Sequence, residues 1–271
     1  MTGRSPSARR DSLSAIESEV VRCVRCPRLV AWRAEAARNP PRRFRGEAYW
    51  ARPLPAFGDP RPRILLVGLA PAAHGGNRTG RMFTGDASGD FLFRALHAVG
   101  LANQPESRRA GDGLALSEVL ITAAVRCAPP DNRPLPEEFA FCREYLDRER
   151  DALPGARVMV ALGSLAFDAS LGSLARSGIP LPRPKPRFAH GAEFEIGGYR
   201  LFATYHPSQQ NTFTGKLTQD MLQAVLARAK RSAAPEDSGV SAPAYVPAEK
   251  LLRGPGRPRS SRSRAPRPPS R

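Results

Sequence analysis

Long apolar runs are absent from this sequence of 271 residues. No window holds eighteen consecutive apolar residues, which excludes a membrane-spanning helix. The first twenty residues lack the apolar segment of a secretory signal, so we expect a cytoplasmic protein. Cysteine is also scarce, with four residues. In a cytoplasmic protein these cysteines are not expected to form structural disulfides.

Acidic residues are too few to balance the basic ones. The chain carries 42 lysines and arginines against 25 aspartates and glutamates, a formal net charge of +17. Residues 233–271 contribute +5 of this and residues 1–19 contribute none, so +12 falls on residues 20–232. A folded body with this charge predicts a polyanionic partner, most commonly nucleic acid. The alternative is an arginine-rich composition without a specific partner.

The chain divides into a central domain and two tails. Residues 1–12 and 233–271 have little to bury, and we expect both to be disordered. The second tail is rich in Pro, Ser, Ala and Arg, and its predicted role is at most a non-specific tether to DNA. Hydrophobic residues make up 41% of the sequence, which is enough for one folded domain over residues 13–232.

The central domain has the pattern of an α/β fold. Four short runs that are nearly apolar throughout predict strands, at 63–69, 118–125, 157–163 and 200–205. Helical patterns occur around them, at 13–22, 89–99, 136–152, 164–174 and 216–231. Such strands, alternating with helices, predict a parallel sheet covered on both faces. Ligands of a sheet of this kind bind beyond the carboxyl ends of its strands.

The four cysteines have the spacing of a metal centre. Cys23 and Cys26 form a C-x2-C pair, and Cys127 and Cys142 follow after a long gap. We expect the second pair to fold back on the first. Zinc and an iron–sulfur cluster both accept four thiolates, and the spacing alone does not choose between them. Unrelated buried cysteines remain an alternative at this point.

A glycine-rich segment, "GLAPAAHGGNRTGRMFTG" at 68–85, follows the first predicted strand directly. It is not a Walker loop, because it contains no lysine, and "GLAPAA" does not supply the G-x-G-x-x-G of a dinucleotide site. A nucleotide triphosphate or NAD site is therefore not favoured.

Several segments together resemble the family 5 (type B) uracil-DNA glycosylases. "GLAPAAHGGNRTGRMFTGDASGDFL" is similar to the first motif of that family, and "TYHPSQQNT" at 204–212 is similar to the second. "ITAAVRCAPPDNRP" at 121–134, "CVRCPRLVAWR" and "FRGEAYWARPLPAFGDP" resemble the family as well. The resemblance runs from about residue 20 to residue 230. It implies a three-layer α/β/α sandwich around a four-stranded parallel sheet, and a [4Fe-4S] cluster held by the four cysteines.

The resemblance also implies a monofunctional DNA glycosylase of base excision repair. Such an enzyme flips uracil, or another deaminated base such as hypoxanthine or xanthine, out of double-stranded DNA and hydrolyses its glycosidic bond, which leaves an abasic site. No lysine occupies a motif where a Schiff base would form, so we expect no lyase step. We expect a nucleoid-associated monomer. The alternatives are a non-catalytic iron–sulfur DNA-binding protein or redox sensor, and a nucleoside hydrolase, which leaves the basic body unexplained.

Three residues match the predicted catalytic positions. Cleavage makes the sugar cation-like and the leaving base anionic, so catalysis needs a negative charge near the sugar and a donor near the base. Asp86 matches the family's acid, although it or Ser88 would also cap the following helix. His206 matches the leaving-group histidine, and Asn132 matches a further active-site position, although it would otherwise pass for a turn residue.

The predicted substrate-binding residues fall in the same motifs. Phe83 is expected to stack on the extruded base, and main-chain amides of 70–76 to bind its carbonyl groups. Many relatives carry an acidic or amide residue in this loop to activate water, whereas this chain has Leu69 and Ala70. The remaining predicted contacts are Ala70, Ala73, His74, Gly75, Gln210 and Asn211 for the base and the minor groove, and Arg78, Arg81 and Lys216 for phosphates.

Overall fold

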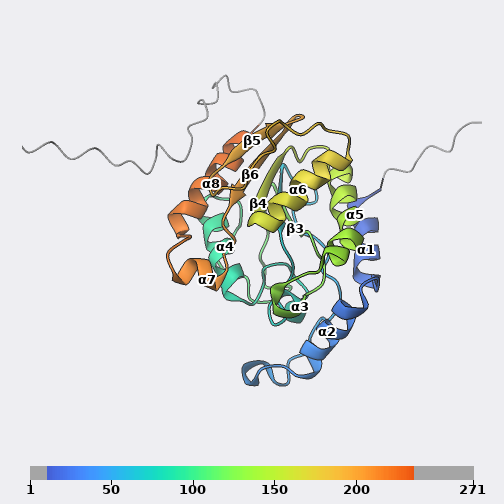
Figure 1. Ribbon diagram of the computed structural model, residues 1–271. Coiled ribbons are helices and arrows are strands. Elements are labelled where there is room, and N and C mark those ends of the chain that lie inside the picture. Colours follow the sequence, from blue (N-terminus) through green and yellow to red (C-terminus); the bar gives the residue numbers. More distant parts are fainter. Residues whose placement is uncertain (1–10, 235–271) are drawn as a thin grey trace, which may run out of the picture. The chain divides into compact units, whose positions relative to one another are not determined.

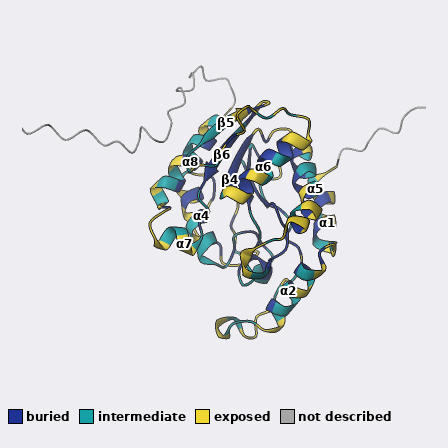
Figure 2. Cartoon of the chain, viewed as in Figure 1, coloured by how far each residue is buried: buried dark blue, intermediate teal, exposed yellow. Residues whose placement is uncertain are grey.

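A computed structural model describes residues 11–234, and the predicted tails lie almost entirely outside these residues. Within the described part, one sheet has six strands in the order β1-β3-β2-β4-β6-β5. The four inner strands are mutually parallel: β3 (Val119–Ala123), β2 (Ile64–Gly68), β4 (Val158–Leu162) and β6 (Tyr199–Thr204). Each lies within a predicted strand, or starts one residue before it, and carries almost only buried side chains, as a sheet covered on both faces requires (Figure 2).

The two faces of the sheet have separate cores. Alternate strand residues such as Ile64 and Leu66 face helices α4 (Ala87–Ala98) and α8 (Gln219–Ser232). Their neighbours Leu65 and Val67 face α5 (Pro136–Ala152) and α6 (Ser164–Arg176). Figure 1 shows α4 and α8 on one side of the strands and α5 and α6 on the other. The α/β class of the prediction is therefore confirmed.

The prediction of a purely parallel four-stranded sheet was wrong, because each edge carries an additional antiparallel strand. β1 (Phe57–Gly58) pairs with β3, and β5 (Glu193–Ile196) pairs with β6. β1 has two residues, too few for a periodic signal. β5 has the sequence "EFEI", and its half-exposed alternation is typical of an edge strand.

The remaining helices lie at the periphery. α1 (Leu13–Arg22) has the predicted bounds, and Ser12 caps it through the amide of Ala15. The sequence analysis missed α2 (Pro27–Arg38), the short helices α3 (Gly76–Thr79) and α7 (Gln209–Phe213), and the 3-10 turns η1 (Arg42–Phe44) and η2 (Pro130–Asn132). Within residues 11–234, no helix combines the length and the apolar character that a bilayer crossing requires.

Candidate active site

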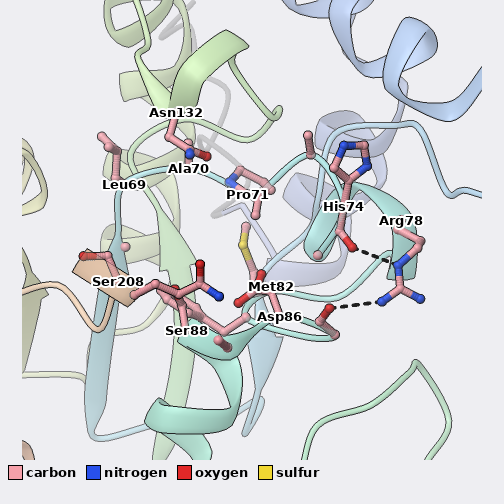
Figure 3. Close-up of a pocket in the computed structure, with 18 of the residues that line it drawn as sticks. Leu69, Ala70, Pro71, His74, Arg78, Met82, Asp86, Ser88, Asn132 and Ser208 are labelled. Atoms are coloured by element: carbon pink, nitrogen blue, oxygen red, sulfur yellow. Dashed lines mark hydrogen bonds between the residues drawn. The ribbon is translucent and has the colours of Figure 1, made fainter. Parts of the chain in front are cut away.

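A cavity of about 1240 Å³ opens beyond the carboxyl ends of the parallel strands. Its walls come from the segments that follow β2, β3 and β6, so the strand order brings distant motifs together. It contains nine of the ten predicted catalytic and base-contacting residues: Asp86, Asn132, His206, Ala70, Ala73, His74, Gly75, Phe83 and Gln210. The exception is Asn211. Figure 3 shows Asp86 and Ser88 across the cavity from Leu69, Ala70 and Pro71.

The loop between β2 and α3 turns its carbonyl groups away from the cavity. The carbonyls of residues 72–75 all accept hydrogen bonds from their own loop and from α3, at 2.8–3.3 Å. The donors are Gly75 N, Asn77 N, Asn77 Nδ2, Arg78 N, Arg78 Nε, Thr79 N and Thr79 Oγ1. The amides of Ala72, Ala73 and His74 form no hydrogen bond within residues 11–234. Successive unpaired amides on a concave loop form a site for a negatively polarised oxygen.

Phe83 forms part of the cavity wall through an unusual backbone. Its φ is +50°, in the left-handed region that non-glycine residues rarely occupy, and such strain persists where the surroundings enforce it. The ring lies on Gly68, where an added Cβ would come within 2.9 Å of Phe83 Cε2. The ring of His206 is also adjacent, with 5.9 Å between the ring centroids. Gly68 therefore makes room for the phenyl ring at the end of β2.

Asp86 caps a helix and faces the cavity at the same time. Its Oδ1 accepts from the amide of Gly89 at 3.0 Å, so Asp86 and not Ser88 is the N-cap of α4. Its Oδ2 lies beside Gly75, where an added Cβ would come within 1.9 Å of it. Burial raises the pKa of this carboxyl above its usual value, and the helix amides oppose the shift. The two roles that the sequence presented as alternatives are both compatible with the geometry.

His206 follows β6 and is held by Asn211. Asn211 Nδ2 donates to the His206 carbonyl at 2.8 Å, which fixes the backbone of the histidine and explains why Asn211 lies outside the cavity wall. Burial lowers the pKa of His206 to about 4, so its imidazole is neutral at physiological pH. A neutral imidazole keeps one N–H to donate and carries no positive charge in the resting site.

Asn132 and His74 complete the cavity wall from two further segments. Asn132 ends the turn η2 with φ +55°, a conformation that asparagine tolerates better than most residues. His74 Nδ1 bonds the hydroxyl of Tyr49 at 3.0 Å, and burial lowers its pKa, with Arg43 and Arg78 adding to the shift. The sequence analysis did not single out Tyr49, because its contact with His74 joins two irregular segments.

The arginines of the first motif hold the loop together. Arg81 is 7% exposed and donates both Nη atoms to Asp112, at 2.7 and 2.8 Å, so its predicted role as a phosphate contact was wrong. Arg78 bonds the carbonyls of His74 and Gly85 and pairs with Glu47, as Figure 3 shows for the two carbonyls. Lys216 lies over the ring of Tyr205, 4.7 Å from its centroid.

An exposed aromatic side chain near the cavity was missed by the sequence analysis. Phe213 ends α7, whose residues Gln209 and Gln210 line the cavity, and it is 80% exposed. A phenyl ring with this exposure contributes little to the core, and it lies on the same short helix as two cavity-lining residues. The missed signal was a large apolar residue within an otherwise polar segment, "SQQNTFTGK".

The four cysteines come together beside this site. Cys26, Cys127 and Cys142 are buried in one cluster with Leu29 and Val125. Cys23 is half-buried and close enough to affect the pKa of Cys26 and Cys127. None of the four forms a disulfide. Burial raises the pKa of Cys26 to about 11 and that of Cys127 to about 12, and neighbouring cysteines add to both shifts. Among the described residues, no three His, Cys, Asp or Glu side chains converge closely enough to hold a single metal ion.

Comparison with known proteins identifies the family. The model of the uracil DNA glycosylase superfamily matches residues 55–230. A Type-5 uracil-DNA glycosylase of Thermus thermophilus is 55% identical over 78% of this chain and 94% of its own length. A Type-5 uracil-DNA glycosylase of Mycobacterium bovis is 50% identical over 82% of both chains. A Type-4 uracil-DNA glycosylase of Sulfurisphaera tokodaii is 30% identical over 73% of this chain and 75% of its own length.

This chain belongs to the uracil-DNA glycosylase superfamily. The identities confirm the resemblance to family 5 and support uracil-DNA glycosylase activity. The cavity that holds Asp86 and His206 is therefore the candidate active site of a uracil-DNA glycosylase. A non-catalytic DNA-binding protein is not favoured.

Proposed function

We propose that this uracil-DNA glycosylase takes a uracil from double-stranded DNA into the cavity and hydrolyses its glycosidic bond, leaving an abasic site. The observation that carries the proposal is the convergence of a carboxylate, a neutral imidazole and three unpaired amides on one cavity. The reaction needs negative charge at the sugar and hydrogen-bond donors at the base, and these groups supply both.

Asp86 acts at the sugar. As the glycosidic bond lengthens, positive charge develops on the sugar ring, and a carboxylate fixed by the start of α4 stabilises it. The same carboxylate orients the attacking water, because Leu69 and Ala70 offer no polar side chain for that purpose. Burial raises the pKa of Asp86, and the amides of Gly89 and Ser88 oppose this shift because they stabilise the ionised carboxylate.

His206 acts at the leaving base. Its neutral imidazole donates a hydrogen bond to the base oxygen on which negative charge develops. Burial disfavours the charged imidazolium, so the neutral form of His206 is the one that meets the base.

The base is recognised mainly by main-chain groups. Amides of Ala72, Ala73 and His74 bind the carbonyl groups of uracil, and Phe83 contacts the face of its ring. Hypoxanthine and xanthine present carbonyl oxygens as well, so the same donors accept these larger deaminated bases. Phe213 then fills the gap left in the duplex, as apolar wedges do in other DNA-binding proteins.

The cysteine cluster fits an iron–sulfur centre. The donor set is purely sulfur, three of the four thiols are buried, and the thiols are close enough to raise one another's pKa values. A [4Fe-4S] cluster binds each cysteine to a different iron, so its ligands need not converge as tightly as those of a single ion. The cluster would be held by Cys23, Cys26, Cys127 and Cys142. Its bonds to these cysteines would cross-link the segment before α2 to the segment after β3.

The test uses duplex oligonucleotides that carry one uracil, one hypoxanthine or one xanthine. We expect alkali-dependent breaks at the uracil, and slower breaks at the two purines, with no break before alkali treatment. Breaks without alkali would contradict the monofunctional mechanism. Cleavage of uracil in single strands only would contradict the proposed use of double-stranded DNA.

A further inference from the structure

One buried side chain connects the base-binding loop to the cysteine cluster. Asn77, in α3, is 0% exposed. Its Nδ2 donates to the carbonyl of Ala73 at 3.3 Å and to the carbonyl of Arg33 at 3.2 Å. Ala73 belongs to the loop with unpaired amides, and Arg33 belongs to α2. A single amide group therefore spans two segments that are 40 residues or more apart in the sequence.

Arg33 continues the connection to the cysteines. Its side chain is 6% exposed, and its Nη1 donates to Cys127 Sγ at 3.0 Å. Its Nη2 donates to the carbonyl of Cys23 at 3.4 Å. The guanidinium thus contacts Cys23, from the first cysteine pair, and Cys127, from the second. The main-chain carbonyl of Arg33 accepts the hydrogen bond from the side-chain amide of Asn77. Arg33 therefore contacts the cysteines through its side chain and Asn77 through its main chain.

The backbone of the loop depends on this contact. Among residues 11–234, the carbonyl of Ala73 has Asn77 Nδ2 as its sole hydrogen-bond donor. A peptide plane is rigid, so the orientation of this carbonyl fixes the orientation of the His74 amide on the other side of the plane. His74 lines the cavity, and its amide is one of the three that have no hydrogen-bond partner within residues 11–234.

We propose that Asn77 is a positioning residue that transmits the arrangement of the cysteine cluster, through Arg33, to the amides that bind the base. The proposal rests on the function proposed above, since it assigns a cause to the geometry of that same loop. Asn77 does not line the cavity and makes no contact with the base. The cluster then serves more than local stability, because its loss relaxes the base-binding loop.

The primary experiment compares iron-loaded wild type with Asn77→Ala on two duplexes. One carries an uncleavable analogue of deoxyuridine, and the other carries an abasic site, which lacks the base that the loop binds. We expect Asn77→Ala to weaken binding of the first duplex about tenfold, since two buried hydrogen bonds are lost. Binding of the abasic duplex should change less than twofold, and iron content and visible absorption should match wild type.

Asn103→Ala is a control at an exposed asparagine far from the cysteines in the sequence. Asn103 also donates its side-chain amide to a backbone carbonyl, that of Gly113 at 2.9 Å, and it does not line the cavity. We expect it to bind both duplexes like wild type. Equal weakening on both duplexes by Asn77→Ala would overturn the proposal, because it would indicate general loss of DNA docking. Unchanged binding of the uracil duplex would overturn it as well.

A second variant tests the transmission. Arg33→Gln keeps the main-chain carbonyl and removes the contact with Cys127, so we expect weaker binding of the uracil duplex and a shifted reduction potential of the cluster. In the double variant Arg33→Gln/Asn77→Ala the two losses should be less than multiplicative. Multiplicative losses would show independent residues and overturn the transmission.

Hydrogen exchange of the loaded protein provides a readout that does not depend on DNA. The hydrogen-bonded amides of Gly75 and Arg78 should exchange faster in Asn77→Ser, which retains a smaller polar side chain, while those of residues 101–117 should not change. Unchanged exchange at Gly75 and Arg78 would overturn the proposal. Failure of wild type to excise uracil would refute the proposed function separately, since none of the binding or exchange measurements requires catalysis.

Discussion

Asp86 gives the sharpest test of the site, because two substitutions separate its two roles. Its carboxylate caps α4 at Gly89 and faces the cavity. Serine is an equally good N-cap, so Asp86→Ser keeps the cap and removes the charge. Asp86→Ala removes both, and the lost cap costs about 1 kcal/mol, which lowers Tm by roughly 2–4 °C in a domain of this size.

The carboxylate itself should matter far more for the rate than for stability. Removal of one electrostatic group that stabilises a transition state typically costs about 10²–10³-fold. We therefore expect both variants to lose about this factor in single-turnover excision of uracil, with Asp86→Ser unfolding at the wild-type temperature. Thr218→Ala is the control, since it removes the N-cap of α8 away from the cavity and should lower Tm without affecting the rate.

The pH dependence adds a second readout. Burial raises the pKa of Asp86, so the rate of wild type should fall with decreasing pH at a value above the ordinary carboxyl pKa, as the ionised form is lost. Asp86→Ser should lack this limb. If Asp86→Ser excises uracil within threefold of wild type, the catalytic assignment is refuted and Asp86 is a helix cap alone.

Three further predictions concern other parts of the cavity. Burial lowers the pKa of His206 to about 4, so between pH 6.5 and 4 the imidazole takes up a proton when the protein unfolds. Wild type should therefore lose stability relative to His206→Gln as the pH falls through this range, which thermal unfolding at several pH values measures. Phe213→Ala should weaken binding of a duplex with an uncleavable uracil about tenfold, by fluorescence anisotropy, with no change in Tm because the ring is exposed. Gly68→Ala should displace the ring of Phe83 and lower the excision rate in single-turnover assays, since the new Cβ would lie within 2.9 Å of the ring.

Each of these predictions has a contrary outcome. Equal pH dependence of wild type and His206→Gln would refute the buried neutral imidazole. Phe141→Ala removes another exposed aromatic, on α5, and an equal loss of binding there would refute a specific role for Phe213. A wild-type rate in Gly68→Ala would show that the phenyl ring does not define the wall.

The inner strands could be predicted because they are short runs that are apolar throughout, and the main helices because their apolar residues recur with the helical period. β2 is apolar on both faces, and α1 and α5 have the bounds that their patterns predict. The edge strand β5 and the four-residue α3 could not be predicted in the same way, since neither buries a repeating face. Short elements depend on contacts with distant segments, which local composition does not record.

The candidate site was predicted by motif and corrected by geometry. Sequence reasoning treats capping and catalysis by Asp86 as competing explanations, whereas the folded chain directs one carboxylate oxygen to the helix and the other towards Gly75. Sequence reasoning also placed Arg81 among the phosphate contacts. It could not show that Arg81 is buried against Asp112, because Asp112 lies in a different loop. Asn77 is a small polar residue in a glycine-rich stretch, and nothing in its neighbours indicates that it bonds α2.

Because the carbonyls of residues 72–75 are bonded within their own loop and α3, the donors left for the base are main-chain amides, which affects how base choice can change. Donors that belong to the main chain are present whatever side chain is encoded, so ordinary point mutations leave them in place. Proline is the exception, because it deletes the N–H. Selection for a different base must therefore work on the walls around the loop, whereas a proline scan of Ala72 and Ala73 removes the donors one at a time.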